Sequence, residues 1–137
     1  MTSNGLKETL AAMERVKKAA KEAAMKQLVK GAQDTADTAR QLAPEDEGDL
    51  RGSIAVTEPG QTTPPHSQPG GSRTAGENEV LVTAGNSDVR YPRHVEHGTV
   101  KMEAQPFFFP AYRLNRDKVR RSTAAAFGRA ARKEWNK

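Results

Sequence analysis

The residues that come nearest to a catalytic or metal-binding cluster are two histidines and a glutamate in the segment His94-Val95-Glu96-His97. Imidazole and carboxylate groups bind zinc and act as general acids and bases. Helical zinc motifs place their two histidines four residues apart, whereas these two are three apart. In a strand, His94 and Glu96 would share one face while His97 pointed to the other. We therefore expect no metal site, no cofactor and no catalytic residue in this segment.

Other chemical signatures are also missing from the sequence. There is no cysteine, so the chain has neither a disulfide nor a thiolate ligand, which fits a reducing compartment. It contains no nucleophile elbow, P-loop or dinucleotide-binding fingerprint. We expect that the chain is not an enzyme. Glu96 is interpreted as a structural partner for an arginine of a neighbouring subunit, or for backbone amides near Gly98-Thr99.

An aromatic knot follows this segment. Phe107, Phe108 and Phe109 lie between Pro106 and Pro110 and are three of the four phenylalanines in the chain. A group this apolar must be buried, either in the fold or against another copy of the chain. Upstream, Gly98 suits a tight turn because glycine adopts positive φ without strain. The segment therefore predicts a turn that leads into an aromatic anchor.

A long amphipathic helix is predicted over residues 1–43. Apolar residues recur there at spacings of three or four, the helical period, namely Leu6, Leu10, Met13, Val16, Ala20, Ala24, Leu28, Ala32, Ala36, Ala39 and Leu42. Gly31 costs about 1 kcal/mol relative to alanine inside a helix, and on this interpretation it marks a bend or a break. At 1.5 Å per residue the helix would be about 60 Å long, more than a small domain covers by itself. Part of its apolar stripe is therefore expected to lie against neighbouring subunits.

The other elements are predicted to complete one α+β domain spanning residues 1–137. Pro44 ends the first helix because proline lacks an amide hydrogen. Alternating apolar residues predict strands over 50–57 and 79–84, joined by a flexible proline- and glycine-rich loop over 58–78. A third strand or a short helix is expected at 91–97, and a C-terminal helix over 106–136. The predicted fold is a long N-terminal helix, a small antiparallel sheet of three to four strands, and a C-terminal helix.

Charge is distributed unevenly along the chain. The net charge is +5, yet residues 112–137 hold nine lysines and arginines against Asp117 and Glu134, which leaves −2 for residues 1–111. An acidic turn lies at 45–49. Opposite patches of this kind suit copies packed side by side in a ring, although a solvated basic helix face has the same pattern. No stretch approaches the roughly 20 apolar residues of a membrane span, so no membrane contact is expected.

Two blocks of the sequence resemble a known protein family. The first block consists of Ala39-Arg40-Gln41-Leu42-Ala43-Pro44 and, after the acidic turn, Gly48-Asp49-Leu50-Arg51-Gly52-Ser53-Ile54. The second consists of Tyr91, Val95, Glu96, Gly98, Thr99, Ala104, Gln105, Pro106, Phe107, Pro110 and Ala111. In this order and spacing, the blocks resemble the small head-tail joining, or tail-completion, proteins of long-tailed bacteriophages.

The resemblance implies a non-catalytic structural protein of the virion, located at the head-tail junction and assembled in the host cytoplasm. Copies are expected to close into a ring, with six as the expected number, that joins the head connector or adaptor proteins to the tail tube. We assign self-association to the aromatic anchor, the acidic turn and Glu96, that is, to Phe107, Phe108, Phe109, Tyr112, Glu45, Asp46, Glu47, Asp49 and Glu96. Contact with a partner, or with DNA that passes through the lumen unread, is assigned to Arg73, Arg116, Arg120, Arg121, Arg129 and Arg132.

The alternative function is that of a small basic nucleic-acid-binding protein. A basic C-terminal helix with Phe127 and Trp135 nearby is able to follow a phosphate backbone. Against this alternative, the sequence contains no recognised DNA- or RNA-binding motif.

Overall fold

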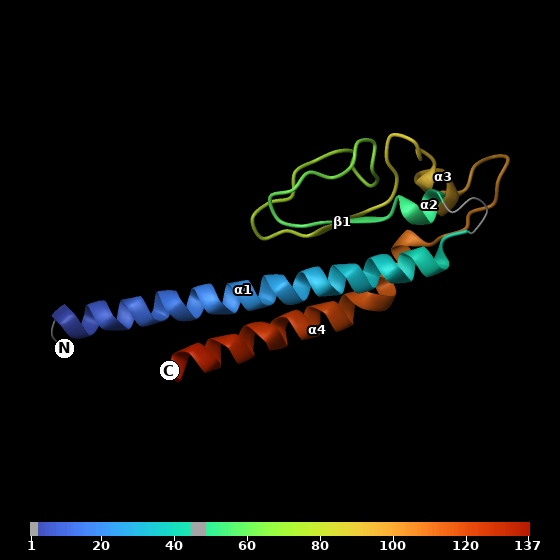
Figure 1. Ribbon diagram of the computed structural model, residues 1–137. Helices are drawn as coiled ribbons and strands as arrows, with labels where there is room; N and C mark the ends of the chain where they lie inside the picture. Colours follow the sequence, from blue (N-terminus) through green and yellow to red (C-terminus); the bar gives the residue numbers. More distant parts are fainter. Residues whose placement is uncertain (1–2, 45–48) are drawn as a thin grey trace.

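Two long helices lie side by side and carry a small sheet and a long loop on one side (Figure 1). The computed structural model of the chain describes residues 3–44 and 49–137. In chain order, the elements are α1 (Ser3–Leu42), α2 (Asp49–Gly52), β1 (Ala55–Thr57), β2 (Leu81–Thr83), α3 (Pro92–His97) and α4 (Phe108–Trp135). No helix within the described ranges is long and apolar enough to span a membrane.

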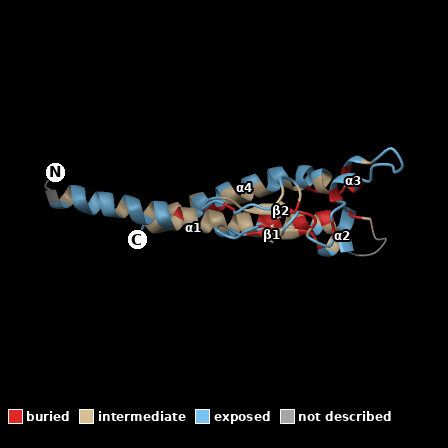
Figure 2. Cartoon of the chain, turned by 90° about the horizontal axis from the view of Figure 1, so that it is seen from above, coloured by how far each residue is buried: buried red, intermediate tan, exposed pale blue. Residues whose placement is uncertain are grey.

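Helices α1 and α4 run antiparallel, so both termini lie at the same end of the molecule (Figure 1). Near one end of the pair, the Asn115 side-chain amide donates a hydrogen bond of 3.0 Å to the Thr38 hydroxyl. Near the other end, the Arg15 Nε lies 3.7 Å from the Glu134 Oε1. A hydrogen bond from the Lys137 ammonium, 2.9 Å away, lowers the pKa of the Glu134 carboxyl. The first turns of α1 extend beyond this pair and have no helix beside them (Figure 2).

The predicted long helix is confirmed, but Gly31 neither bends nor breaks it. Helix α1 is continuous from Ser3 to Leu42, and Gly31 is buried within it. A Cβ atom built on Gly31 would lie 2.7 Å from Val119 Cγ1 and 2.8 Å from Val119 Cγ2. Glycine is therefore needed here because the Val119 side chain of α4 occupies the space that a Cβ atom would take, a reason that only the helix pair reveals.

Substitution of Gly31 tests this close approach. Gly31→Ala is expected to lower the free energy of unfolding by about 1 to 2 kcal/mol, because the stiff, β-branched Val119 must move. In a Val119→Ala background, the same change should be neutral or stabilising by up to about 1 kcal/mol, because alanine favours the helix once the clash is removed. Denaturant unfolding of the four proteins measures the coupling. An equal cost in both backgrounds would contradict the proposed contact.

The sheet has two strands in the described part of the chain, so the prediction of three to four strands was wrong. Strands β1 and β2 pair antiparallel, as predicted, with Val56 opposite Val82. The segment predicted as a third strand or a short helix forms the helix α3, whose first turn accepts Pro92 because the missing amide hydrogen has no helical partner there. The first predicted strand is shortened to three residues because its beginning forms α2.

The hydrophobic core lies at the C-terminal end of α1, where the sheet, α2, α3 and the start of α4 meet (Figure 2). Alanines of α1 form one side of it, and Phe107 is its largest side chain, with 0% exposure. The small alanine side chains allow the other elements to approach α1 closely. Two arginines attach the following segment to α1: Arg40 donates to the Ile54 carbonyl at 2.7 Å, and Arg51 donates to the Ala43 carbonyl at 3.0 Å.

The long loop over residues 58–78 folds back on itself and onto the sheet. Backbone hydrogen bonds of 2.8 Å join Thr63 to Arg73 and Ala75 to Gln61. Further along, Gln68 and Ala84 exchange two backbone bonds of 2.8 and 3.0 Å. Ser67 and Ala75 are buried. The loop therefore contains backbone pairing that its proline and glycine content does not indicate, and its flexibility stays a prediction.

Candidate functional site

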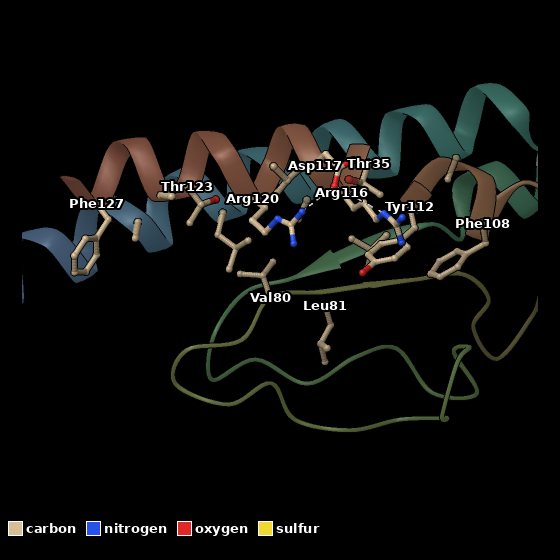
Figure 3. A pocket seen from close by; sticks show the side chains of 17 residues that line it. Thr35, Val80, Leu81, Phe108, Tyr112, Arg116, Asp117, Arg120, Thr123 and Phe127 are labelled. Carbon is tan, nitrogen blue, oxygen red and sulfur yellow. Dashed lines mark hydrogen bonds and ion pairs between the residues drawn. The ribbon is translucent and has the colours of Figure 1, made fainter. Parts of the chain in front are cut away.

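A groove of about 1060 Å³ runs between the helix pair and the sheet. Helix α1 forms its floor, α4 forms one wall, and residues 80–82 form the other (Figure 3). In Figure 3, Val80 lies on the helix side of β2, whereas Leu81 points toward the loop. The residues that line the groove are Ala24, Leu28, Ala32, Thr35, Ala39, Val80, Leu81, Val82, Phe108, Tyr112, Arg116, Asp117, Val119, Arg120, Thr123, Ala124 and Phe127.

The groove is mostly apolar, with a single charged cluster on the α4 wall. Asp117 Oδ1 lies 3.1 Å from Arg120 Nη2 and 4.0 Å from Arg116 Nε, so one carboxylate is shared by two guanidinium groups. The cluster keeps a net positive charge. Nearby, Phe127 and Tyr112 are 48% and 54% exposed, although they are large and apolar. Such a surface suits an apolar partner that also carries a carboxylate, and its lining includes no pair of groups suited to acid-base chemistry.

Glu96 is a further polar residue that the fold positions tightly. It is buried, with 7% exposure. Its Oε2 accepts backbone N–H bonds from Phe107 at 2.8 Å and Phe108 at 2.9 Å, and its Oε1 accepts one from Phe109 at 3.1 Å. These amides open α4, and the first amides of a helix lack helical partners and favour a negative charge. Glu96 therefore fixes the start of α4.

The comparisons with known proteins decide the family. A family model described as "Bacteriophage HK97-gp10, putative tail-component" matches residues 7–98, about two thirds of the chain. The chain belongs to this family. The resemblance to phage head-tail joining proteins drawn from the sequence is thereby confirmed. No curated protein and no solved structure matches the chain.

The HK97-gp10-like match covers most of α1, both strands and α3, but it ends before α4. It therefore includes the floor and the β2 wall of the groove, as well as Glu96. The α4 wall, with its charged cluster, lies outside the matched range.

For Glu96, the structure shows one of the two predicted kinds of partner. Backbone amides were one alternative, but the location predicted for them, near Gly98-Thr99, was wrong. The chain turns at Gly98, with φ of 76°, and returns so that Gln105 donates to the Val95 carbonyl at 2.8 Å. This return brings the amides of Phe107 to Phe109 onto the carboxylate. The assignment of Glu96 to a subunit interface has no support from this geometry, because both carboxylate oxygens accept bonds within the chain.

The two histidines beside Glu96 lie on α3 and are exposed. His97 contacts the Phe109 ring at a centroid distance of 6.0 Å. Across residues 3–44 and 49–137, no three histidine, cysteine, aspartate or glutamate residues are grouped so that they could hold a metal ion. In this segment, Glu96 holds the start of α4, and the two histidines lie at the surface.

Alanine substitutions of the histidines test this interpretation. His94→Ala and His97→Ala are each expected to change the free energy of unfolding by less than about 1 kcal/mol, because both side chains are exposed and His97 loses one aromatic contact. Thermal denaturation with and without added zinc measures both the stability and any metal effect. A zinc-dependent stabilisation of the unmodified protein that either variant abolished would contradict the structural role.

The predicted aromatic anchor is divided between the core and the surface. Phe107 is fully buried, Phe108 lines the groove, and Phe109 is 40% exposed. Tyr112 lines the groove one turn further along α4. In the acidic turn, Asp49 is exposed on α2, whereas Glu45, Asp46 and Glu47 lie outside the described residues. Of the aromatic anchor, only the exposed side chains are therefore accessible to another subunit.

The predicted basic residues are also separated by the fold. Arg116 and Arg120 belong to the groove, while Arg121, Arg129 and Arg132 are exposed elsewhere on α4. Arg73 lies in the loop, and its Nη2 is 3.1 Å from the Glu79 Oε2. These six arginines therefore do not form a single surface.

Sequence reasoning missed the groove as a candidate site, and it expected part of the α1 stripe to lie against neighbouring subunits without locating that part. Leu6, Leu10 and Met13 are 52%, 53% and 55% exposed on the first turns of α1. Their spacing was visible in the sequence as part of the helical period. What the spacing does not show is where along α1 the end of α4 lies, and this position leaves the stripe uncovered.

Proposed function

We propose that this chain is a structural subunit of the phage virion that assembles as a ring at the head-tail junction. In this role it completes or terminates the tail and joins the tail tube to the head connector or adaptor proteins. The supporting observation is the apolar surface that one copy leaves uncovered, in the groove and on the first turns of α1. Membership of a phage tail-component family agrees with a structural role.

Self-association is expected because leaving this apolar surface in contact with water is unfavourable. Large apolar side chains that gather on one face of a soluble protein generally mark an interaction site. Copies of one chain most often form closed symmetric assemblies, because a closed ring leaves no interface unsatisfied. We propose six copies in the ring, and light scattering of the purified protein measures the number.

The basic residues on α4 outside the groove have a place in this proposal. Lys118, Arg121, Arg129 and Arg132 follow one another at spacings of three, eight and three, which places them on one side of the helix. All four are exposed. A side of this kind, directed into the ring lumen, would contact the phosphates of passing DNA without reading its sequence.

The test is particle assembly in the phage that encodes the chain. Loss of the gene is expected to yield separate heads and tails in electron micrographs, because the joint lacks its ring. Supplying the intact gene in trans should restore joined particles, which controls for effects on neighbouring genes. Joined, infectious particles in the complete absence of the protein would contradict the proposed function.

Nucleic-acid binding as a separate function is the second candidate, and the basic side of α4 is the observation that favours it. A lumen-lining role predicts weak, sequence-independent binding that falls steeply with salt, with dissociation constants of about 10⁻⁴ to 10⁻⁶ M. A regulator would bind one sequence at least about a thousandfold more tightly. Fluorescence anisotropy with random and genomic duplexes at two salt concentrations separates these outcomes.

A further inference from the structure

The first turns of α1 form an overhang, defined here as residues 3–13, which extends beyond the end of α4 (Figures 1 and 2). Arg15 of α1 pairs with Glu134 near the end of α4, just beyond the overhang. Leu6, Leu10 and Met13 recur at helical spacing on the overhang, and each is more than half exposed. A helix of this length in water depends on packing against its apolar side. The overhang therefore presents an apolar stripe in need of a partner.

The overhang is unable to occupy the groove of its own chain. Helix α1 is continuous from Ser3 to Leu42, and its own residues, Ala24 and Leu28 among them, are the floor of that groove. To reach the groove, the first turns would have to bend back over the same helix. A rigid helix forbids this, so any overhang in the groove belongs to another molecule.

The stripe fits within the length of the groove and shares its apolar character. From Leu6 to Met13 the stripe spans about 10 Å, and the groove floor from Ala24 to Ala39 spans about 22 Å, at 1.5 Å per residue. The groove presents apolar walls through Val80, Val82 and Phe127. Proteins commonly recognise one another in this way, when a helix places apolar side chains from successive turns in an apolar groove.

Charge also favours the seating of the stripe in the groove. The α4 wall carries Arg116 and Arg120 around the single carboxylate of Asp117, so it has a positive charge in excess. Glu14 follows the stripe directly, at four residues from Leu10, and is exposed. A carboxylate at this position lies beside the stripe on the helix surface, where it would meet the arginines of the wall.

We propose that the α1 overhang of one copy seats Leu6, Leu10 and Met13 in the groove of the next copy. The contact is heterologous, with two different surfaces of the same chain meeting, and it therefore closes into a ring when the rotation between neighbours divides a full turn. This inference rests on the self-association in the proposed function, and it identifies the two surfaces that carry it.

Cysteine cross-linking of the full-length chain tests the contact, because the chain has no cysteine of its own. Leu10→Cys protein is mixed with Ala124→Cys protein, since Ala124 is an exposed alanine of the groove wall. Mild oxidation should yield a covalent dimer, because a disulfide requires Cα atoms within about 7 Å. Glu8→Cys is the matched control, because Glu8 lies on nearly the opposite side of the helix from Leu10.

The Leu10→Cys pair is expected to give at least about tenfold more dimer than the Glu8→Cys pair, because the bound cysteines are held at a high effective concentration. Equal yields from both pairs, or no dimer from either, overturn the contact. A second pair of variants checks assembly without oxidation. Leu10→Glu should convert rings to monomers in light scattering, whereas Ala11→Glu, which adds the same charge at an exposed neighbouring position, should leave rings intact. Rings that survive Leu10→Glu also overturn the proposal.

These measurements separate the contact from the proposed function. Cross-linking between purified copies reports the contact alone, and particle assembly reports the function alone. A cross-linked pair together with normal particles in the absence of the gene would refute the junction role and keep the contact. A protein that is required for joining but fails to cross-link would refute the contact and keep the role.

Discussion

Phe107→Ala is expected to lower the free energy of unfolding by about 3 to 5 kcal/mol. The Phe107 side chain has 0% exposure and is the largest group in the core, where it packs among the alanines of α1, Ile54 and Val95. Its removal would leave a cavity that these small side chains fill only in part, because alanine has no rotamers with which to collapse into the space. Equilibrium denaturation in urea measures the loss, and an unchanged m-value would show that the unfolded state is unaffected.

Phe109→Ala is the matched control for this prediction, because it removes the same side chain two residues away. Phe109 is 40% exposed, and its ring contacts those of His97 and Phe108. The expected loss is below about 2 kcal/mol, since less apolar surface returns to water and no closed cavity forms. Similar losses for the two variants would mean that Phe107 is not the central side chain of the core.

Glu96→Ala is expected to destabilise the protein by about 3 kcal/mol or more. Hydrogen bonds to charged groups contribute about 1.5 to 3 kcal/mol each, and the loss of this carboxylate leaves the first amides of α4 without an acceptor beside the core. Because the amides belong to Phe107, Phe108 and Phe109, the substitution also loosens the aromatic segment that forms the core and the groove wall. Urea denaturation measures stability, and amide hydrogen exchange at the three phenylalanines reports the local effect.

Glu96→Gln and Glu103→Gln complete this experiment. The glutamine at position 96 keeps one oxygen for two of the amides but places an NH2 group against the third, so we expect an intermediate loss of about 1 to 2 kcal/mol. Glu103 is exposed, and its replacement should change stability by less than about 0.5 kcal/mol. Exchange rates at Phe107 to Phe109 that are unaltered in Glu96→Ala would show that the carboxylate does not hold the start of α4.

Several features of this protein were determined by its sequence alone, because they depend on local patterns. The three- and four-residue spacing of apolar residues predicted α1 over nearly its full length, and Pro44 predicted its end. The two sequence blocks indicated the phage family, which the match over residues 7–98 confirmed. The C-terminal helix was predicted over 106–136 and forms from Phe108 to Trp135. Periodicity and proline act within a few residues, so each of these features is visible without a partner segment.

Tertiary structure alone decided the features that depend on contacts between distant segments. From the sequence, Gly31 is only a weak point of a helix, whereas in the structure the Val119 side chain packs directly against it. Glu96 was expected to meet a neighbouring arginine or amides near Gly98-Thr99, but the return of the chain after Gly98 brings the amides of Phe107 to Phe109 onto it. The aromatic residues divide between core and groove according to the direction in which α4 leaves Glu96. The groove itself exists only because α1, α4 and β2 meet, and the overhang is exposed only because α4 ends first. Such features are fixed by where segments far apart in the chain lie in space, which no local spacing encodes.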